Sequence, residues 1–247
     1  HSFPTRRSSD LFDISENDMV RFVFDENDIY SLLSNKIKCI LEGRNNNIII
    51  LTEKGVNSIN KETYRVKSYP YDEMNINLFM NKNFKIINDG KYLWIATMDG
   101  LYRDGYEDHE VIDYKDNFLQ NGIKNYKIYD IFQDESDENI LWLAGGLEGG
   151  LEGGLIKFHK TEGVIKNYLS SSDKNSLSYD SINCIQGDGK GNLWIGTESG
   201  LNKFNIKEES FINYYEQDGL CGNQFNKRAA YKTKSGQLLF GTTKGVV

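Results

Sequence analysis

The sequence has little alanine, which supplies four of 247 residues, whereas asparagine supplies 26. Alanine is the best helix former and asparagine favours turns, so this composition argues against a helical bundle. Long apolar runs are missing too, because the longest has about five residues and a membrane-spanning helix needs roughly 20. The net charge of −7 argues against a nucleic-acid partner, which requires a basic face. Aromatic residues make up 13% of the chain, which excludes a disordered acidic tail and favours a folded protein.

The two ends of the chain carry distinctive segments. His1–Leu11 has the sequence HSFPTRRSSDL, which resembles the translation of a common sequencing adapter, so residues 1–11 are set aside as an artefact. The other end stops at Gly245–Val247, inside an apolar stretch and without a polar tail. We therefore expect an internal fragment of a longer protein, whose own N-terminus precedes this sequence.

An apolar segment recurs five times along the chain. Three copies contain tryptophan and two flanking copies, at 48–56 and 238–246, lack it. A glycine follows each copy at spacings of 45, 54, 46 and 45 residues, and the long spacing contains Leu-Glu-Gly-Gly twice in tandem. Five ordered copies indicate a repeat architecture. The structural residues predicted from this repeat are Trp94, Gly100, Trp142, Gly154, Trp194, Gly200, Gly241 and Gly245, with Gly55 as the glycine of the first copy.

Each repeat predicts four short antiparallel strands. In the fourth copy they are expected at 182–186, 193–197, 201–205 and 211–215, joined by turns rich in glycine and polar residues. Side chains alternate between the two faces of a strand, so Leu193 and Ile195 lie on one face and Trp194 on the other. Because both faces are apolar, both must be covered, and four-stranded sheets stacked face to face satisfy this requirement. The sequence therefore predicts an all-β fold, a β-propeller of four-stranded antiparallel blades.

About five blades fit into this chain. Residues 12–247 are predicted to form a partial β-propeller, with repeat cores near 37–60, 84–104, 128–160, 182–206 and 228–247. Small residues such as Gly196, two positions after tryptophan, are expected to leave room on the tryptophan-bearing face.

The fourth copy resembles a known family. Asp188–Phe204, with the sequence DGKGNLWIGTESGLNKF, closely resembles the two-component regulator propeller repeat. Asp218–Asn226 and Ser235–Gly241 resemble the final blade of the sensors that carry this repeat. The resemblance extends over about residues 37–247. The sequence departs from the family's pattern in lacking tryptophan in the first copy and in having Cys221 where proline is usual.

The resemblance implies a sensor. Such propellers form the extracytoplasmic region of bacterial membrane receptors and usually have about seven blades, so this chain would be an incomplete ring with exposed blade edges. The partners implied are an extracellular small molecule or glycan, the remaining blades, and an adjoining immunoglobulin-like module. A membrane span and a histidine kinase or other output would follow, so membrane contact would come only through those parts. The implied location is the periplasmic or extracellular side of the membrane, and a homodimer is compatible with it.

Catalytic and metal-binding patterns are not found in the sequence, and no cofactor is expected. Cys39 and Cys184 occupy the same repeat position in different blades, so they are predicted to be core residues too distant for a disulfide, and Cys221 a free loop thiol. His109 and His159 belong to no catalytic motif. Asp188–Asn192 departs from both a calcium loop and the Asp-box of sialidase propellers, so turn chemistry is its simpler interpretation.

Ligand contacts are expected on the long variable loops, because propellers present their loops at two faces. The loops at 67–83 and 103–127 carry aromatic side chains suited to stacking on sugar rings, together with an arginine and a histidine. The alternative is that these tyrosines only pack between blades. The candidate ligand-binding residues are Tyr69, Tyr71, Tyr102, Arg103, Tyr106, His109 and Tyr126.

Three functions compete at this point. The first is a non-enzymatic sensor that binds a ligand and relays a rearrangement to an output module. The second is a propeller glycoside hydrolase or lyase, which needs two positioned carboxylates that the sequence does not single out. The third is a protein-interaction scaffold, ranked lower because the Trp-Asp and Gly-His signatures of WD repeats are missing.

Overall fold

The computed structural model describes residues 9–13, 18–43, 46–70, 85–105, 110–124, 127–146 and 153–247. The chain divides into two compact units. The smaller unit contains 1–82, 88–94 and 103–111, and the larger contains 83–87, 95–102 and 112–247. Each unit is described by itself below.

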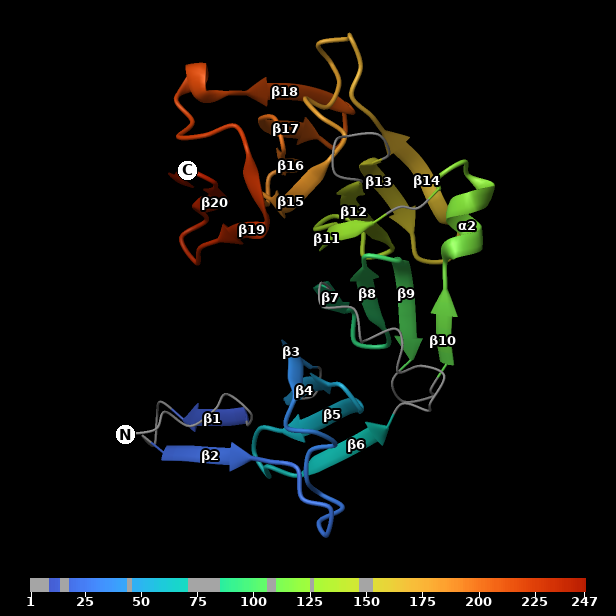
Figure 1. The fold of residues 1–247 in the computed structure, drawn as a ribbon, viewed down its shortest axis with the longest axis vertical. Helices are drawn as coiled ribbons and strands as arrows, with labels where there is room; N and C mark the ends of the chain where they lie inside the picture. The colour runs from blue at the N-terminus through green and yellow to red at the C-terminus, as the bar shows by residue number, and fades with distance from the viewer. Residues whose placement is uncertain are drawn as a thin grey trace. The chain divides into compact units, whose positions relative to one another are not determined.

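The described residues form almost only antiparallel strands (Figure 1). Four sheets have four strands each, one has three, and a hairpin has two. The hairpin is β1 (Ser9–Asp13) and β2 (Asp18–Phe22). The four-stranded sheets are β3 (Ile37–Glu42), β4 (Asn47–Thr52), β5 (Gly55–Asn60) and β6 (Val66–Pro70); β7 (Lys85–Asn88), β8 (Leu93–Thr97), β9 (Gly100–Gly105) and β10 (Glu110–Asp113); β11 (Ile128–Gln133), β12 (Ile140–Gly146), β13 (Gly153–His159) and β14 (Gly163–Tyr168); and β15 (Ile182–Gly187), β16 (Asn192–Thr197), β17 (Leu201–Asn205) and β18 (Ser210–Tyr214).

The last sheet is shorter, and helical structure is sparse. β19 (Phe225–Lys232), β20 (Leu238–Thr242) and β21 (Gly245–Val246) form the three-stranded sheet. Among the described residues, two short helices occur between strands, α2 (Lys115–Gln120) and the 3-10 helix η1 (Glu216–Asp218). No helix in the described part of the chain is both long and apolar enough to cross a membrane. The strands follow chain order within each sheet, so the chain is a partial β-propeller, as the sequence predicted.

The turn between the second and third strands repeats in four blades. A threonine hydroxyl donates to the carbonyl of a glycine three residues on, at 2.9–3.1 Å, and accepts a hydrogen bond from the backbone N–H two residues on. The glycines of all five copies have φ between +107° and +154°, which a side chain would strain. The threonines are Thr52, Thr97, Thr197 and Thr242. This geometry explains why glycine recurs at even intervals in the sequence.

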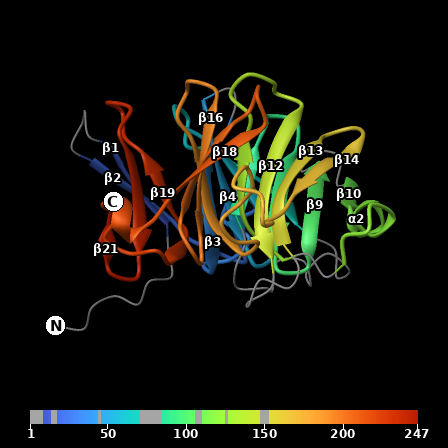
Figure 2. The ribbon, with the colours of Figure 1, turned by 90° about the horizontal axis from the view of Figure 1, so that it is seen from above.

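The sheets of the larger unit are covered on both faces, as predicted. Trp142 of β12 packs with Leu193 and Ile195 of β16 in one buried cluster. Trp194, on the opposite face of β16, packs in a second cluster with Phe225 of the following sheet. Figure 2 shows β12, β16 and β19 in successive sheets. Burial of a large aromatic side chain contributes on the order of 3 kcal/mol, so these interleaved tryptophans are major sources of stability.

Close approach of the sheets explains the small residue two positions after tryptophan. A Cβ atom on Gly196 would lie 2.6 Å from the Cys184 sulfur and 2.7 Å from a ring carbon of Phe225. Any larger residue would therefore push the neighbouring blade away, which confirms the role predicted for this position.

The smaller unit repeats the same core. Phe22, Leu32, Ile50, Ile59 and Val66 form its buried cluster. The last four lie 145 residues before Leu177, Ile195, Phe204 and Phe211, which occupy the corresponding cluster of the larger unit. The hairpin β1–β2 adds Phe22 to this cluster, and β1 includes residues 9–11, which the sequence had set aside as adapter-derived.

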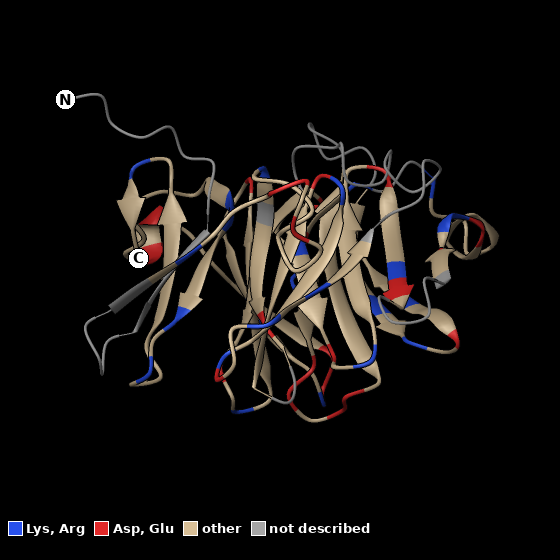
Figure 3. Cartoon of the chain, turned by 90° about the horizontal axis from the view of Figure 1, so that it is seen from below, with Lys and Arg blue, Asp and Glu red and all other residues tan. Residues whose placement is uncertain are grey.

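Two expectations about loops were wrong in part. The segment 67–83 begins inside β6, where Tyr69 pairs with Val56 across the sheet. The segment 103–127 contains the end of β9, β10 and α2. The helix was missed because six residues with one buried side chain, Phe118, give no periodic apolar pattern. In Figure 3, many Lys, Arg, Asp and Glu positions lie at strand ends and in loops, and others lie within strands.

Candidate functional site

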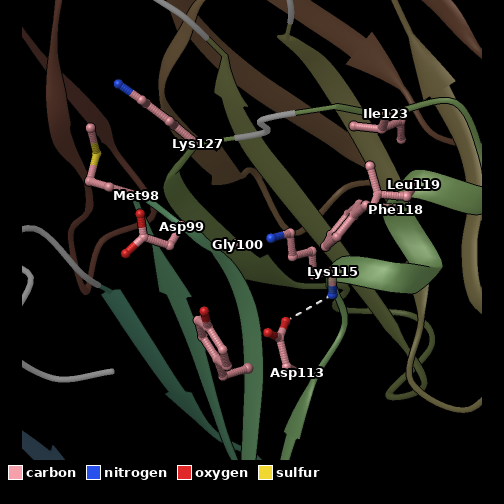
Figure 4. Close-up of a pocket in the computed structure, with 10 residues that line it drawn as sticks. Met98, Asp99, Gly100, Asp113, Lys115, Phe118, Leu119, Ile123 and Lys127 are labelled. Carbon is pink, nitrogen blue, oxygen red and sulfur yellow. Dashed lines mark hydrogen bonds between the residues drawn. The ribbon is translucent and has the colours of Figure 1, made fainter. Parts of the chain in front are cut away.

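A cavity of about 500 Å³ lies in the larger unit, between the β8–β9 turn, the end of β10 and helix α2 (Figure 4). Its polar lining residues are Asp99, Tyr102, Asp113, Lys115 and Lys127. Its apolar lining residues are Met98, Phe118, Leu119 and Ile123. The volume falls in the range of about 300–1,000 Å³ that is usual for small-molecule sites. The mixed lining is also typical of such sites.

Local structure places the polar groups on this cavity. Asp99 lies in the turn between β8 and β9, where its backbone N–H donates to the Thr97 hydroxyl at 3.0 Å, so its position is fixed by the repeated turn. Tyr102 follows on β9 and is 8% exposed. The Asp113 carboxylate accepts a hydrogen bond of 2.8 Å from the backbone N–H of Lys115, which starts α2. The carboxylate thereby orients the first turn of the helix that closes the cavity.

Burial and two carboxylates determine the ionisation of Tyr102. Burial raises the pKa of its phenol to about 12, and the negative charges of Asp113 and Asp99 add to the shift. The phenol therefore keeps its proton at physiological pH and can donate as well as accept a hydrogen bond. A neutral donor next to two acceptor groups is suited to a ligand rich in hydroxyl groups.

Helix α2 supplies the apolar wall. Phe118 is buried and its ring lies 6.2 Å from the ring of Phe158, while Tyr114, just before the helix, contacts Phe158 edge-on at 5.0 Å. Leu119 is 44% exposed and presents apolar surface beside the cavity. In Figure 4, Phe118 and Leu119 lie on the helix side and Met98 and Asp99 on the strand side. Both sides of the cavity mix polar and apolar groups, with Met98 on the strand side and Lys115 at the start of the helix.

The predicted ligand residues are only partly brought to this cavity. Tyr102 lines it. Tyr69 lies on β6 in the smaller unit with the Lys67 amine 5.0 Å from its ring, and Arg103 stacks its guanidinium 4.1 Å from the ring of Tyr92. The other candidates, Tyr71, Tyr106, His109 and Tyr126, lie outside the described residues.

Most cavity residues were not singled out from the sequence. Asp99 and Asp113 were two among many carboxylates, and Phe118 and Leu119 lay in a segment that was expected to be a loop. The available signal was their nearness in sequence to Tyr102. Its use would have required the pairing of β10 with β9, which the sequence alone does not give.

Cysteine and metal chemistry find no support in the part of the chain that the structure describes. All three cysteines are free thiols, with Cys184 buried, Cys39 half-buried and Cys221 exposed. Burial and the nearby charge of Asp130 raise the pKa of the Cys184 thiol, which keeps it in its unreactive form. No group of three or more His, Cys, Asp or Glu side chains could hold a metal ion among these residues.

Comparison with known proteins places the repeat in a family. Residues 176–199 match the two component regulator propeller. A stretch of 73 residues is 29% identical to histidine kinase P4 from Formosa agariphila, covering 30% of this chain and 5% of that protein. The chain therefore spans a small part of the curated relative that it matches.

Solved structures share the fold. The extracellular domain of BT3049 from B. thetaiotaomicron, described as a hybrid two component system, is 21% identical with a TM-score of 0.64, over 96% of this chain and 32% of that one. The extracellular domain of BT4673 from the same organism, described as a one component system, is 15% identical with a TM-score of 0.56, over 90% and 33%. The β-propeller domain of Cps50 from Myceliophteria thermophila is 14% identical with a TM-score of 0.54, over 83% and 63%. The chain is thus a partial β-propeller that carries the two-component regulator propeller repeat.

Proposed function

We propose that this chain is the ligand-sensing propeller region of a bacterial two-component-type receptor and that it binds a glycan in the cavity beside Tyr102. The observation that carries the proposal is the set of groups around this cavity. Tyr102, Asp99 and Asp113 offer hydrogen bonds to hydroxyl groups, and Phe118 and Leu119 offer an apolar wall. The repeat match at 176–199 supports a sensor of two-component type.

The location and relay follow from the same proposal. The solved structures with this fold include extracellular domains of such systems, which supports a position on the periplasmic or extracellular side of the membrane. The sensor would act by favouring one receptor arrangement, which requires that the ligand bind the two arrangements with different affinity. The further blades, an immunoglobulin-like module and an output domain would be partners in the same receptor.

Binding of defined glycans by variants tests this proposal. Tyr102→Phe removes one hydrogen-bonding group and Asp113→Asn removes a charged acceptor, so each is expected to weaken binding about tenfold or more in isothermal titration calorimetry. The matched controls are Tyr69→Phe and Asp116→Asn. Tyr69 is also 8% exposed but lies in the other unit, and Asp116 lies on α2 without lining the cavity. Both controls should bind as the wild type does.

Two outcomes would contradict the proposal in different ways. Binding that is insensitive to Tyr102→Phe and Asp113→Asn would place the ligand elsewhere. Failure of every glycan in a broad panel to bind would remove the glycan-sensor function itself.

A hydrolytic enzyme is the second candidate, because Asp99 and Asp113 line the same cavity. Chromatography of oligosaccharides after prolonged incubation separates the two functions. A sensor leaves the oligosaccharide intact, whereas a hydrolase yields shorter products that Asp99→Asn or Asp113→Asn abolishes.

A further inference from the structure

A second, smaller cavity lies against the same loop as the first. It has a volume of about 190 Å³ and is lined by Gly122, Ile123 and Lys124 after α2, and by Asn167, Leu169 and Asp180 from the neighbouring blade. Ile123 also lines the larger cavity. Both cavities belong to the larger unit, and they share Ile123 as a lining residue.

The two cavities differ in the size of the ligand that each can hold. The larger one lies within the range of about 300–1,000 Å³ that accommodates a whole small molecule, and the smaller one lies below it. The smaller cavity has room for only part of such a ligand. A ligand in the smaller cavity must therefore extend into another site. The larger cavity, on the other side of Ile123, is the adjacent site.

The walls of the second cavity are fixed by hydrogen bonds. One Asp180 carboxylate oxygen accepts from the backbone N–H of Ser170, and the Asp180 carbonyl accepts from the N–H of Gly154 at 2.8 Å. The side-chain amide of Asn167 donates to the Gly153 carbonyl at 3.3 Å. A cavity with walls held in this way is formed before a ligand arrives, which lowers the entropic cost of binding.

The chemistry of the second cavity matches that of the first. Leu169 is 49% exposed and so offers an apolar surface that the protein leaves uncovered. Asp180 and Lys124 provide an acceptor and a donor beside it. The first cavity has the same combination, an exposed leucine, carboxylates and lysines, so one type of ligand unit fits both.

We propose that the second cavity is a further binding subsite, which takes the next unit of a linear polyhydroxylated ligand that occupies the first cavity and crosses Ile123. The inference rests on the proposed glycan-binding function and adds the place, direction and length of the ligand. One or two sugar units would occupy only the larger cavity. A chain of three or more units would use both.

A length series of each ligand measures the subsite directly. The probes are the mono-, di-, tri- and tetrasaccharides of linear glucan, xylan, arabinan and mannan, titrated into the full chain by calorimetry. Tri- and tetrasaccharides of the recognised series should bind about tenfold more tightly than the disaccharide. Leu169→Ala and Lys124→Ala should remove that gain and leave the affinity for the shortest binding probe unchanged.

A matched control separates this effect from a general loss of structure. Ile212→Ala changes another exposed apolar residue, 54% exposed on β18 and outside both cavities, and should leave the whole series unchanged. Equal affinity for short and long probes, or a length gain that survives Leu169→Ala and Lys124→Ala, would overturn the subsite while leaving the glycan-binding function standing. Failure of all probes to bind would overturn both.

Discussion

At the residue scale, each tryptophan of the repeat is tied to an aspartate in the turn that precedes its strand. The indole N–H of Trp94 donates to Asp89 and that of Trp142 donates to Asp134, both at 2.7 Å, and Trp194 makes the same bond to Asp188. The polar edge of each large ring thus has a partner. The segment 188–192, which superficially resembles an ion-binding loop, has this structural role.

Asp134→Ala is expected to destabilise the larger unit by about 2 kcal/mol. Asp134 is buried and accepts hydrogen bonds from Ser136, from the backbone N–H of Asp137 and from Trp142, so its loss leaves a buried indole N–H without a partner. Urea denaturation at pH 7 measures the change. The control is Glu138→Ala, an exposed residue of the same turn, which should change the stability by less than about 0.5 kcal/mol.

The pH dependence of that difference gives a second readout. Burial alone would raise the pKa of Asp134, but the hydrogen bonds from Ser136 and Trp142 outweigh it and hold the pKa below its usual value. The stabilisation is therefore fully present above the unfolded-state pKa of about 3.9 and lost as the pH falls through the lower folded-state pKa. The difference between the wild type and Asp134→Ala should shrink below pH 4, and a constant difference would contradict this assignment.

At the scale of elements, helix α2 connects the candidate site to the neighbouring blade. Phe118 lines the larger cavity and packs on Phe158 of β13. One position earlier, the side-chain oxygen of Asn117 accepts a hydrogen bond of 2.9 Å from the backbone N–H of Val164 on β14. A ligand that contacts Phe118 would therefore contact a helix that is itself bound to β13 and β14 of the next blade.

Asn117→Ala is expected to loosen the start of β14 and to lower the free energy of unfolding by about 1 kcal/mol, because the Val164 N–H loses its partner. Hydrogen exchange of the Val164 amide should become faster. The control is Asn121→Ala at the other end of α2, whose side chain donates only to the Asn117 carbonyl. Unchanged exchange at Val164 in the Asn117 variant would show that α2 does not hold this strand.

Elements of the repeat were predictable from the sequence and the inserted helix was not. The two-faced strand recurs along the chain and the Thr–Gly turn recurs in four copies, so the same physical requirement can be recognised several times in the sequence. The aspartate–tryptophan bonds lie at separations of five, eight and six residues, so no fixed spacing marks them. Of the candidate site, Tyr102 was found because aromatic residues on variable segments stand out. Its carboxylate neighbours Asp99 and Asp113 were not found, since their proximity depends on strand pairing.

At the scale of the whole molecule, a half-buried ion pair within the larger unit connects strands of three consecutive sheets. The Lys85 amine at the start of β7 pairs with the Asp130 carboxylate on β11, and the other oxygen of Asp130 accepts from the backbone N–H of Ile185 on β15 at 3.0 Å. Asp130 is 1% exposed. The sequence does not predict this pair, because Lys85 and Asp130 are 45 positions apart and the chain has many other charged residues. It links the first strands of three successive sheets, β7, β11 and β15.

Although Lys85 is partly exposed, Lys85→Met is expected to lower the free energy of unfolding by roughly 3 kcal/mol at pH 8, because Asp130 is left charged and buried. Burial already raises the pKa of Asp130 against the opposing effect of Lys85, and loss of the lysine raises it further. A carboxyl with a raised folded-state pKa destabilises the fold above its unfolded-state pKa of about 3.9, so the variant should regain stability as the pH falls from 8 to about 4. The double variant Lys85→Met/Asp130→Asn removes the buried charge and should be more stable than Lys85→Met alone at pH 8, with no such pH dependence. Denaturant titrations of the four proteins of this cycle measure the coupling, and additive losses at both pH values would show that the pair does not link the sheets.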